Sequence, residues 1–375
     1  METSLTKTKH FFAELVQAAG ITINGNNPWD IQIHHPAFYD RILQENSIGL
    51  GESYMDHWWD CNKLDEFFYR LLRANLDSKT KPNARLLIKL MLARFINFQT
   101  KYKSLRVGKQ HYDIGNSLFE RMLDHRLNYT CGYWKNAADL ETAQLAKLKL
   151  VCDKLALQPG MRVLDIGCGW GSFAKYAAIQ YGVSVVGVTI SEQQCLYAKE
   201  SCQGLPIEIR FQDYRDVQGT FDRIVSLGMF EHVGHLNYCH FMTLVHRCLA
   251  EEGLFLLHTI GSNKTLFKAD EWISKYIFPS GMLPSISQIG KSIEGLFIME
   301  DWHNFGADYD KTLMAWHQNF NQHWEEIKIH YDDRFFRMWN YYLLQCAGGF
   351  RSRSMQLWQI VLSKKGILGG YQSIR

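Results

Sequence analysis

The 375-residue sequence lacks long apolar runs, and no stretch approaches the roughly 18 consecutive apolar residues of a membrane-spanning helix. Its start, METSLTKTKHFFAELVQ, has no apolar core followed by small residues, so we do not expect a secretory signal. The nine cysteines include no C-x-x-C pair, and an odd, scattered set is typical of reduced thiols rather than of disulfides or a zinc site. These absences predict a cytoplasmic protein without a bound metal.

Acidic residues are absent from one long segment, 79–109, which we name the basic belt. It contains nine lysines and arginines, although the whole chain has 41 basic against 38 acidic residues. Such a belt can be a solvated helix and linker, or it can be attracted to phosphate groups of nucleic acid or anionic lipid. Within it, LLIKLMLARFINF (86–98) is apolar on all sides. This pattern favours a lipid interface or a core helix over nucleic acid.

The periodicity of apolar residues divides the chain into two predicted domains. In the first, residues 1–100, we expect a small α+β domain with a hairpin around Asn24-Gly25 and a glycine-rich turn at 49–60. Its helices are expected at 9–19, 36–45 and 63–75.

In the second predicted domain, residues 101–375, short apolar strands alternate with helices after residue 140. Such alternation predicts an α/β domain with a doubly wound, Rossmann-like parallel sheet. Residues 262–345 are expected to form a helical, aromatic insertion. The strands are predicted at 161–167, 184–190, 207–213, 221–228, 253–260 and 356–364, with helices at 140–156 and 171–181.

The glycine-rich segment VLDIGCGWGSFA (163–174) follows the first of these strands and opens a helix. A dinucleotide site would need glycine in place of Ser172, and the G-x-G-x-G spacing is instead that of class I S-adenosylmethionine-dependent methyltransferases. The loop amides and the helix N-terminus can meet the cofactor's carboxylate, and an acid at the strand end can hold its cationic end. The predicted loop residues are Asp165, Gly167, Gly169 and Gly171.

Two further strand ends supply candidates for the rest of the cofactor. Thr189 and Gln194 follow the second strand, where such folds bind the ribose. After the third strand, Asp213 can accept a hydrogen bond from the adenine amine and Tyr214 can cover the ring, although Asp213 can also be a solvated loop acid. Leu227 ends the fourth strand beside the expected adenine site.

Eight ordered motifs together resemble one family, the cyclopropane-fatty-acyl-phospholipid synthases. The segment GLGESYMDHWW (49–59) also resembles the N-terminal signature of the bacterial members, with His57 where glycine is expected. The related mycolic acid cyclopropane synthases resemble only the part after about residue 100. The motifs are HYDIGNSLFERMLD (111–124), YTCGYW (129–134), VLDIGCGWGS, VGVTIS, QDYRD, GMFEHVG (228–234), LLHTIG (256–261) and WHNFGADYDKTLMAW (302–316).

The resemblance implies transfer of a methylene group from S-adenosylmethionine to the cis double bond of an unsaturated phospholipid acyl chain. It also implies that a bound bicarbonate ion removes the proton that lets the ring close. An anion beside Glu231 requires that the two share a proton or that His258 is cationic, because two bare negative charges repel. By the same resemblance, the ion's cradle falls on Cys131, Glu231, His258, the backbone of Ile260 and Tyr309, and the cofactor is covered by Tyr112, Tyr129 and Thr130.

Other roles remain open for several of these residues. Cys131 can be a small buried hydrophobe and Tyr309 a packing aromatic. Cys346 is a weak candidate nucleophile, because the attack of an alkene on a sulfonium methyl group requires no covalent enzyme intermediate. Two other functions also remain: C-methylation of an alkene without ring closure, and lipid binding without catalysis. The resemblance further implies a phospholipid substrate and a homodimer. The basic belt with its apolar segment 86–98 predicts peripheral binding to anionic phospholipid on the inner face of the membrane, and no binding of nucleic acid.

Overall fold

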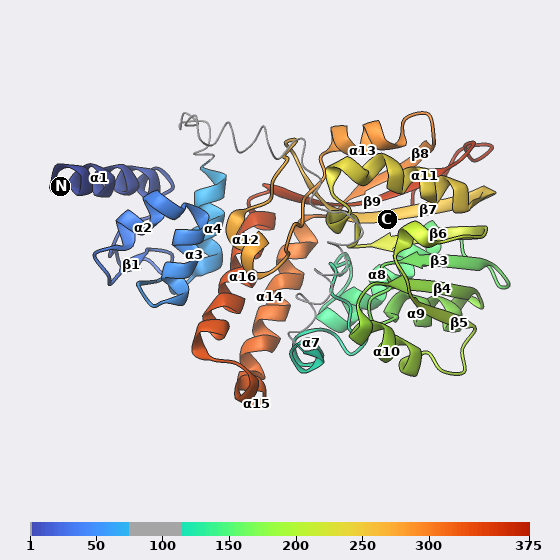
Figure 1. Cartoon of the computed structure of the whole chain (residues 1–375), viewed down its shortest axis with the longest axis horizontal. Helices are drawn as coiled ribbons and strands as arrows, with labels where there is room; N and C mark the ends of the chain where they lie inside the picture. The colour runs from blue at the N-terminus through green and yellow to red at the C-terminus, as the bar shows by residue number, and fades with distance from the viewer. Residues whose placement is uncertain (1, 75–114) are drawn as a thin grey trace. The chain divides into compact units, whose positions relative to one another are not determined.

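The computed structural model describes residues 2–74 and 115–375, which form two compact units (Figure 1). The first, which we name the helical unit, combines the described residues up to 74 with Ala269–Pro279 and Tyr309–Met355. The second, the sheet unit, contains the described residues from 115 to 268, Ser280–Asp308 and Gln356–Arg375. The helical unit therefore holds two later segments as well as residues of the predicted domain 1–100. The predicted boundary near residue 100, the basic belt and Tyr112 lie outside the described residues.

The helical unit confirms the helices predicted at 9–19, 36–45 and 63–75. Two short strands, β1 (Gln32–Ile33) and β2 (Trp59–Asp60), pair antiparallel beside them. The helices of this unit are α1 (Glu2–Ala18), α2 (Phe38–Glu45), α3 (Ser47–Met55), α4 (Leu64–Arg73), α12 (Glu271–Tyr276), α14 (Ala307–Gln322), α15 (Trp324–Ile327) with the 3₁₀ turn η5 (Lys328–His330), and α16 (Asp333–Arg351).

The hairpin predicted around Asn24-Gly25 is wrong. The carboxylate of Asp30 accepts hydrogen bonds from the backbone N–H groups of Thr22 (2.7 Å) and Asn27 (2.8 Å), and this closes an irregular loop. The strand that follows, β1, pairs antiparallel with residues 59–60, whereas the preceding segment meets residue Ile31 in an isolated parallel bridge from Ile23. A side-chain-to-backbone contact has therefore replaced the strand pairing that an Asn-Gly dipeptide favours.

The glycine-rich turn predicted at 49–60 is also wrong, because most of this segment is helix α3. Its glycines allow close packing. A Cβ at Gly49 would lie 2.5 Å from the carbonyl oxygen of Arg41, and one at Gly51 would lie 2.3 Å from the indole of Trp272. Tertiary contact thus stabilises helix where local propensity favours a turn.

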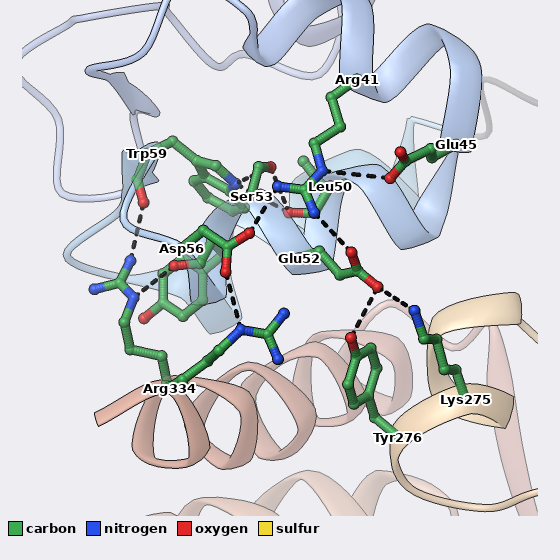
Figure 2. A network of polar contacts seen from close by, with 12 residues as sticks. Arg41, Glu45, Leu50, Glu52, Ser53, Asp56, Trp59, Lys275, Tyr276 and Arg334 are labelled. Atoms are coloured by element: carbon green, nitrogen blue, oxygen red, sulfur yellow. Dashed lines mark hydrogen bonds and ion pairs between the residues drawn. The ribbon is translucent and has the colours of Figure 1, made fainter. Parts of the chain in front are cut away.

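An ion-pair network ties α2 and α3 to α12 and α16 (Figure 2). Arg41 donates to Glu52 (2.6 Å) and to Asp56 (2.7 Å). Glu52 also accepts from Lys275 (2.5 Å) and from the hydroxyl of Tyr276 (2.8 Å). Because the Glu52 carboxylate has so many donors, its pKa stays below the usual value although burial alone would raise it. The network fixes α12 within the helical unit.

The sheet unit confirms the predicted doubly wound α/β fold. Its seven strands have the order β5-β4-β3-β6-β7-β9-β8, in which β3 to β7 pair parallel and β8 pairs antiparallel to β9. All six predicted strands are present, and β8, which has no apolar run, was not predicted. The strands are β3 (Arg162–Ile166), β4 (Ser184–Thr189), β5 (Ile207–Phe211), β6 (Phe221–Leu227), β7 (Leu249–Ser262), β8 (Ile298–Asn304) and β9 (Met355–Ser363).

Helices cover both faces of this sheet because successive strand residues point to opposite sides. On one face, Val163 and Leu256 pack against α8 (Leu140–Lys154) and α9 (Ser172–Tyr181). On the other, Leu164 and Phe255 pack against α11 (Tyr238–Cys248) and α13 (Ile286–Ile293). The remaining elements are α7 (Asn116–Met122), α10 (Glu192–Ser201) and the 3₁₀ turns η2 (Tyr214–Asp216), η3 (Phe230–His232) and η4 (His235–Asn237). Within the two described ranges, no helix has the length and apolarity to cross a membrane.

Candidate active site

The glycine loop between β3 and α9 has three glycines in the left-handed region: Gly167 (φ +85°), Gly169 (φ +55°) and Gly171 (φ +84°). A Cβ at Gly167 would lie 2.8 Å from the side chain of Met229, and one at Gly171 would lie 3.3 Å from the Cβ of Ala198. Leaving out its chain neighbours Cys168 and Trp170, no heavy atom of the described residues lies within 4 Å of a Cβ built at Gly169. Gly169 is therefore where the loop leaves open room for a ligand to approach its backbone.

Asp165, the acid predicted beside this loop, is 1% exposed in β3. Burial raises its pKa to about 7, and the nearby ammonium of Lys147 opposes that rise. Its Oδ2 atom has no hydrogen-bond partner among the described residues. A buried carboxyl oxygen without a partner is costly unless a ligand completes it, so this residue fits the cationic end of S-adenosylmethionine.

The segment expected to cover the cofactor is held by a buried lysine that sequence reasoning missed. Lys147 of α8 donates to Asn128 Oδ1 (2.9 Å) and to Thr130 Oγ1 (3.0 Å). Ser172, at the start of α9, donates to the same oxygen of Asn128 (2.9 Å). Burial lowers the pKa of Lys147 to about 8. The sequence did carry a signal for this buried lysine: it stands at a position of the predicted helix where the periodicity favours an apolar residue.

The Cγ2 atom of Thr130 lies 2.7 Å from the position that a Cβ at Gly228 would take. Thr130 therefore packs against the end of β6. Leu227, just before that glycine, pairs with His258 in the register of β6 and β7. Tyr129 packs its ring against Phe119, with centroids 5.1 Å apart. These contacts place the covering segment beside the strand ends, where parallel α/β sheets bind their ligands.

The other predicted cofactor residues already have structural contacts. Thr189 Oγ1 donates to Gln194 Oε1 (3.1 Å), and both side chains are buried. Asp213 accepts from the backbone N–H (2.9 Å) and the guanidinium (3.0 Å) of Arg215. The ring of Tyr214 packs in the core 5.3 Å from that of Phe241. Their roles toward ribose and adenine stay predictions.

A second cluster lies at the ends of β6 and β7. Glu231, in η3, accepts a hydrogen bond from the backbone N–H of Ile260 at its Oε1 atom (2.7 Å), and the Oε2 atom has no partner in the described part of the chain. Its own carbonyl accepts from the N–H of Met282 (2.8 Å). Burial raises the pKa of Glu231 to about 7, opposed first by the Ile260 N–H and then by its own N–H and the nearby hydroxyl of Thr259. This carboxyl can therefore carry a proton near neutral pH.

His258, in β7, is 1% exposed and completes the cluster. Burial and the charges of Lys147 and Lys154 hold its pKa well below the usual value, so the ring is neutral. Its Nδ1 atom lies 3.3 Å from the side-chain nitrogen of Gln359, and its Nε2 atom has no partner among the described residues. An anion beside Glu231 needs either a cationic His258 or a proton shared with the Glu231 carboxyl. The neutral His258 ring therefore favours the shared proton.

The remaining predicted catalytic residues are divided between the two units. Cys131 is fully buried in the sheet unit, and its thiol donates to the carbonyl of Gly132 (3.1 Å). Tyr309, in the helical unit, stacks on Phe350 with centroids 4.5 Å apart. Cys346 lies on α16, and burial raises the pKa of its thiol to about 12. A thiol that stays protonated is a poor nucleophile, which favours the structural role for Cys346.

Comparison with known proteins supplies the family. The sequence profile described as mycolic acid cyclopropane synthetase matches residues 99–360. Cyclopropane-fatty-acyl-phospholipid synthase of Escherichia coli strain K12 is 56% identical over 362 residues, which cover 96% of this chain and 94% of that protein. The chain belongs to the mycolic acid cyclopropane synthetase family. It is thus an S-adenosylmethionine-dependent enzyme of methylene transfer to lipid.

Two solved structures of the mycolic acid cyclopropane synthetase family share the fold. The cyclopropane synthase MmaA2 from Mycobacterium tuberculosis has a TM-score of 0.66 at 30% identity, covering 72% of this chain and 100% of its own. The mycolic acid cyclopropane synthase CmaA1, complexed with SAH and CTAB, has a TM-score of 0.65 at 30% identity, covering 69% and 98%. As predicted, these relatives match only part of the chain, whereas the Escherichia coli relative matches nearly all of it.

The buried carboxyl of Glu231 predicts how stability depends on pH. Its folded pKa, about 7, lies above the ordinary 4.5, so the folded state binds this proton more tightly and loses stability as pH rises from 4.5 to 7. Glu231→Gln removes this dependence. Relative to the wild type, we expect the variant to gain on the order of 3 kcal/mol above pH 7, measured by denaturant unfolding at a series of pH values.

The matched control is Glu294→Gln, which changes an exposed glutamate of the same unit. It shows how much the free energy of unfolding changes when the sheet unit loses an exposed carboxylate. The prediction is contradicted if the free energies of unfolding of Glu231→Gln and the wild type differ by the same amount from pH 4.5 to pH 8. Glu231 would then not be held protonated by the fold.

Proposed function

We propose that this chain converts the cis double bonds of unsaturated phospholipid acyl chains into cyclopropane rings, with S-adenosylmethionine as methylene donor and bound bicarbonate as general base. The observation that carries the proposal is the pair Glu231 and His258. Both are buried at adjacent strand ends, and each has one polar atom without a partner among the described residues. The name of the Escherichia coli relative supports phospholipid as the lipid class.

The reaction needs these two side chains for a physical reason. An unactivated alkene that takes the sulfonium methyl group becomes a carbocation, and ring closure then requires a base beside an apolar acyl chain. Bicarbonate supplies that base when bound. A protonated Glu231 donates from Oε2 and a neutral His258 donates from Nε2, so the two present donors to an anion without adding charge of their own. Two hydrogen bonds to an anion in a dry site are stronger than the same bonds in water.

The cofactor is proposed to lie along the glycine loop. The open room at Gly169 admits its amino-acid end, and the partnerless oxygen of Asp165 can accept from its ammonium group. Lys147, through Asn128 and Thr130, holds the covering segment against the start of α9. The helix N-terminus there favours the cofactor's carboxylate.

Membrane association and dimerisation are proposals that the described residues do not address. The charge of the basic belt and the apolar segment 86–98 support reversible binding to anionic phospholipid on the inner face of the membrane. The homodimer is carried over from the family resemblance alone.

The open room at Gly169 predicts a selective effect on cofactor binding. We expect Gly169→Ala to weaken S-adenosylmethionine binding about tenfold or more in isothermal titration calorimetry, because its Cβ enters the space left for the ligand. Gly160→Ala is the control: Gly160 also has a left-handed φ (+85°) and open space at its Cβ, but it precedes β3. Both variants should lose roughly 1 kcal/mol of stability. Equal cofactor affinity in the two would remove Gly169 from the site.

The proposed ring closure predicts the isotope content of the product. With S-adenosylmethionine deuterated in its methyl group, the modified acyl chain should keep two of the three deuterons, because one leaves as the proton that the base takes. Mass spectrometry of acyl chains from phospholipid vesicles measures this. Retention of all three deuterons would contradict ring closure and establish methylation without a ring.

A further inference from the structure

A row of polar side chains crosses the sheet face that α8 covers. Gln359 of β9 lies between β7 and β8, opposite His303 in the register of β8 and β9, so their side chains share a face. His303 accepts from the ammonium of Lys154 (3.1 Å). On the other side, Gln359 reaches His258. The row therefore runs from the candidate base site into the sheet.

Gln359 occupies a position that core packing alone would fill with an apolar residue. It is 0% exposed, and its neighbours Leu357 and Val361, two residues away on the same face, are both fully buried and apolar. Burying a carboxamide costs free energy unless it makes hydrogen bonds. Its nitrogen has one such contact, to His258, while its oxygen has none among the described residues. Within the described part of the chain, the side-chain amide thus makes one hydrogen bond, and that bond goes to the histidine of the site.

The contact decides which ring nitrogen of His258 carries the proton. A neutral imidazole has one N–H and one lone pair, and a carboxamide nitrogen only donates. When Gln359 Nε2 donates to Nδ1 (3.3 Å), the ring proton must be on Nε2. The Nε2 atom is then a donor toward the site. The opposite tautomer would present a lone pair there, and a lone pair repels an anion.

We infer that Gln359 is a positioning residue, which holds His258 in the tautomer that donates from Nε2 to the anion in the base site. This inference rests on the proposed function, because it gives His258 the task of binding that anion. Gln359 does so without touching substrate or cofactor. It fixes the proton and the orientation of the ring, as outer hydrogen-bond partners do for histidines in metal sites.

The experiment compares the wild type with Gln359→Leu, Gln359→Glu and Gln356→Leu. Leucine keeps the size but removes the donor, and glutamate accepts from Nδ1 and so draws the proton there. Gln356, also buried in β9, bonds Asn304 instead (3.0 Å), so its change controls for loss of a buried amide from the same strand. The nitrogen NMR shifts of His258 in ¹⁵N-histidine-labelled protein report the tautomer, assigned by comparison with His258→Gln.

We expect the wild type and Gln356→Leu to show a proton on Nε2, and Gln359→Glu to show one on Nδ1. Turnover of Gln359→Leu and Gln359→Glu should fall about 10- to 100-fold, with the KM for S-adenosylmethionine unchanged. A wild-type ring protonated on Nδ1 would overturn the inference. So would a Gln359→Leu variant whose turnover falls no further than that of Gln356→Leu.

Failure of the proposed function gives a different pattern. If His258→Ala retains wild-type turnover, His258 binds no essential anion, and both proposals fall. If His258→Ala is inactive while both Gln359 variants keep full turnover, the proposed function stands and only the role of Gln359 is overturned.

Discussion

The hydrogen bond from the backbone of Ile260 to the carboxyl of Glu231 (2.7 Å) is the constraint on which the candidate base site depends. It fixes a buried acid where β6 and β7 end, leaves the second carboxyl oxygen without a described partner, and lets burial raise the pKa to about 7. An acid that can keep its proton at neutral pH can donate to an anion. A fully ionised carboxylate in the same place would repel it.

Helix α8 supplies the electrostatic environment that complements this bond. Its buried lysines, Lys147 and Lys154, both lower the pKa of His258, which burial already depresses. Lys147 also ties down the covering segment and opposes the burial effect on Asp165. Helix α8 thus contacts the segment expected to cover the cofactor, and its charges also act on His258 in the candidate base site. A substitution in α8 can therefore affect both halves without touching either ligand.

Much of this site could be predicted from the sequence, because parallel strands end at one edge and their following residues converge there. The family resemblance named Glu231, His258 and Ile260, and their position where β6 and β7 end agrees with this rule. The glycine spacing predicted the loop. Lys147 and Gln359 were missed because each acts through another side chain, and such contacts have no spacing signature. The helix at 47–55 and strand β8 were missed for a related reason: close packing at Gly51 and pairing with β9 override weak local patterns.

The central claim is that neutral donors at the ends of β6 and β7 hold a bicarbonate ion that serves as the base. Its most direct test is the initial rate of ring formation, measured on unsaturated phospholipid vesicles in carbon-dioxide-depleted buffer as bicarbonate is added. The account predicts that the wild-type rate rises from near zero and saturates, and that Glu231→Ala, which removes the donor, needs more bicarbonate and reaches a lower maximum. A wild-type rate that does not change with bicarbonate would contradict it.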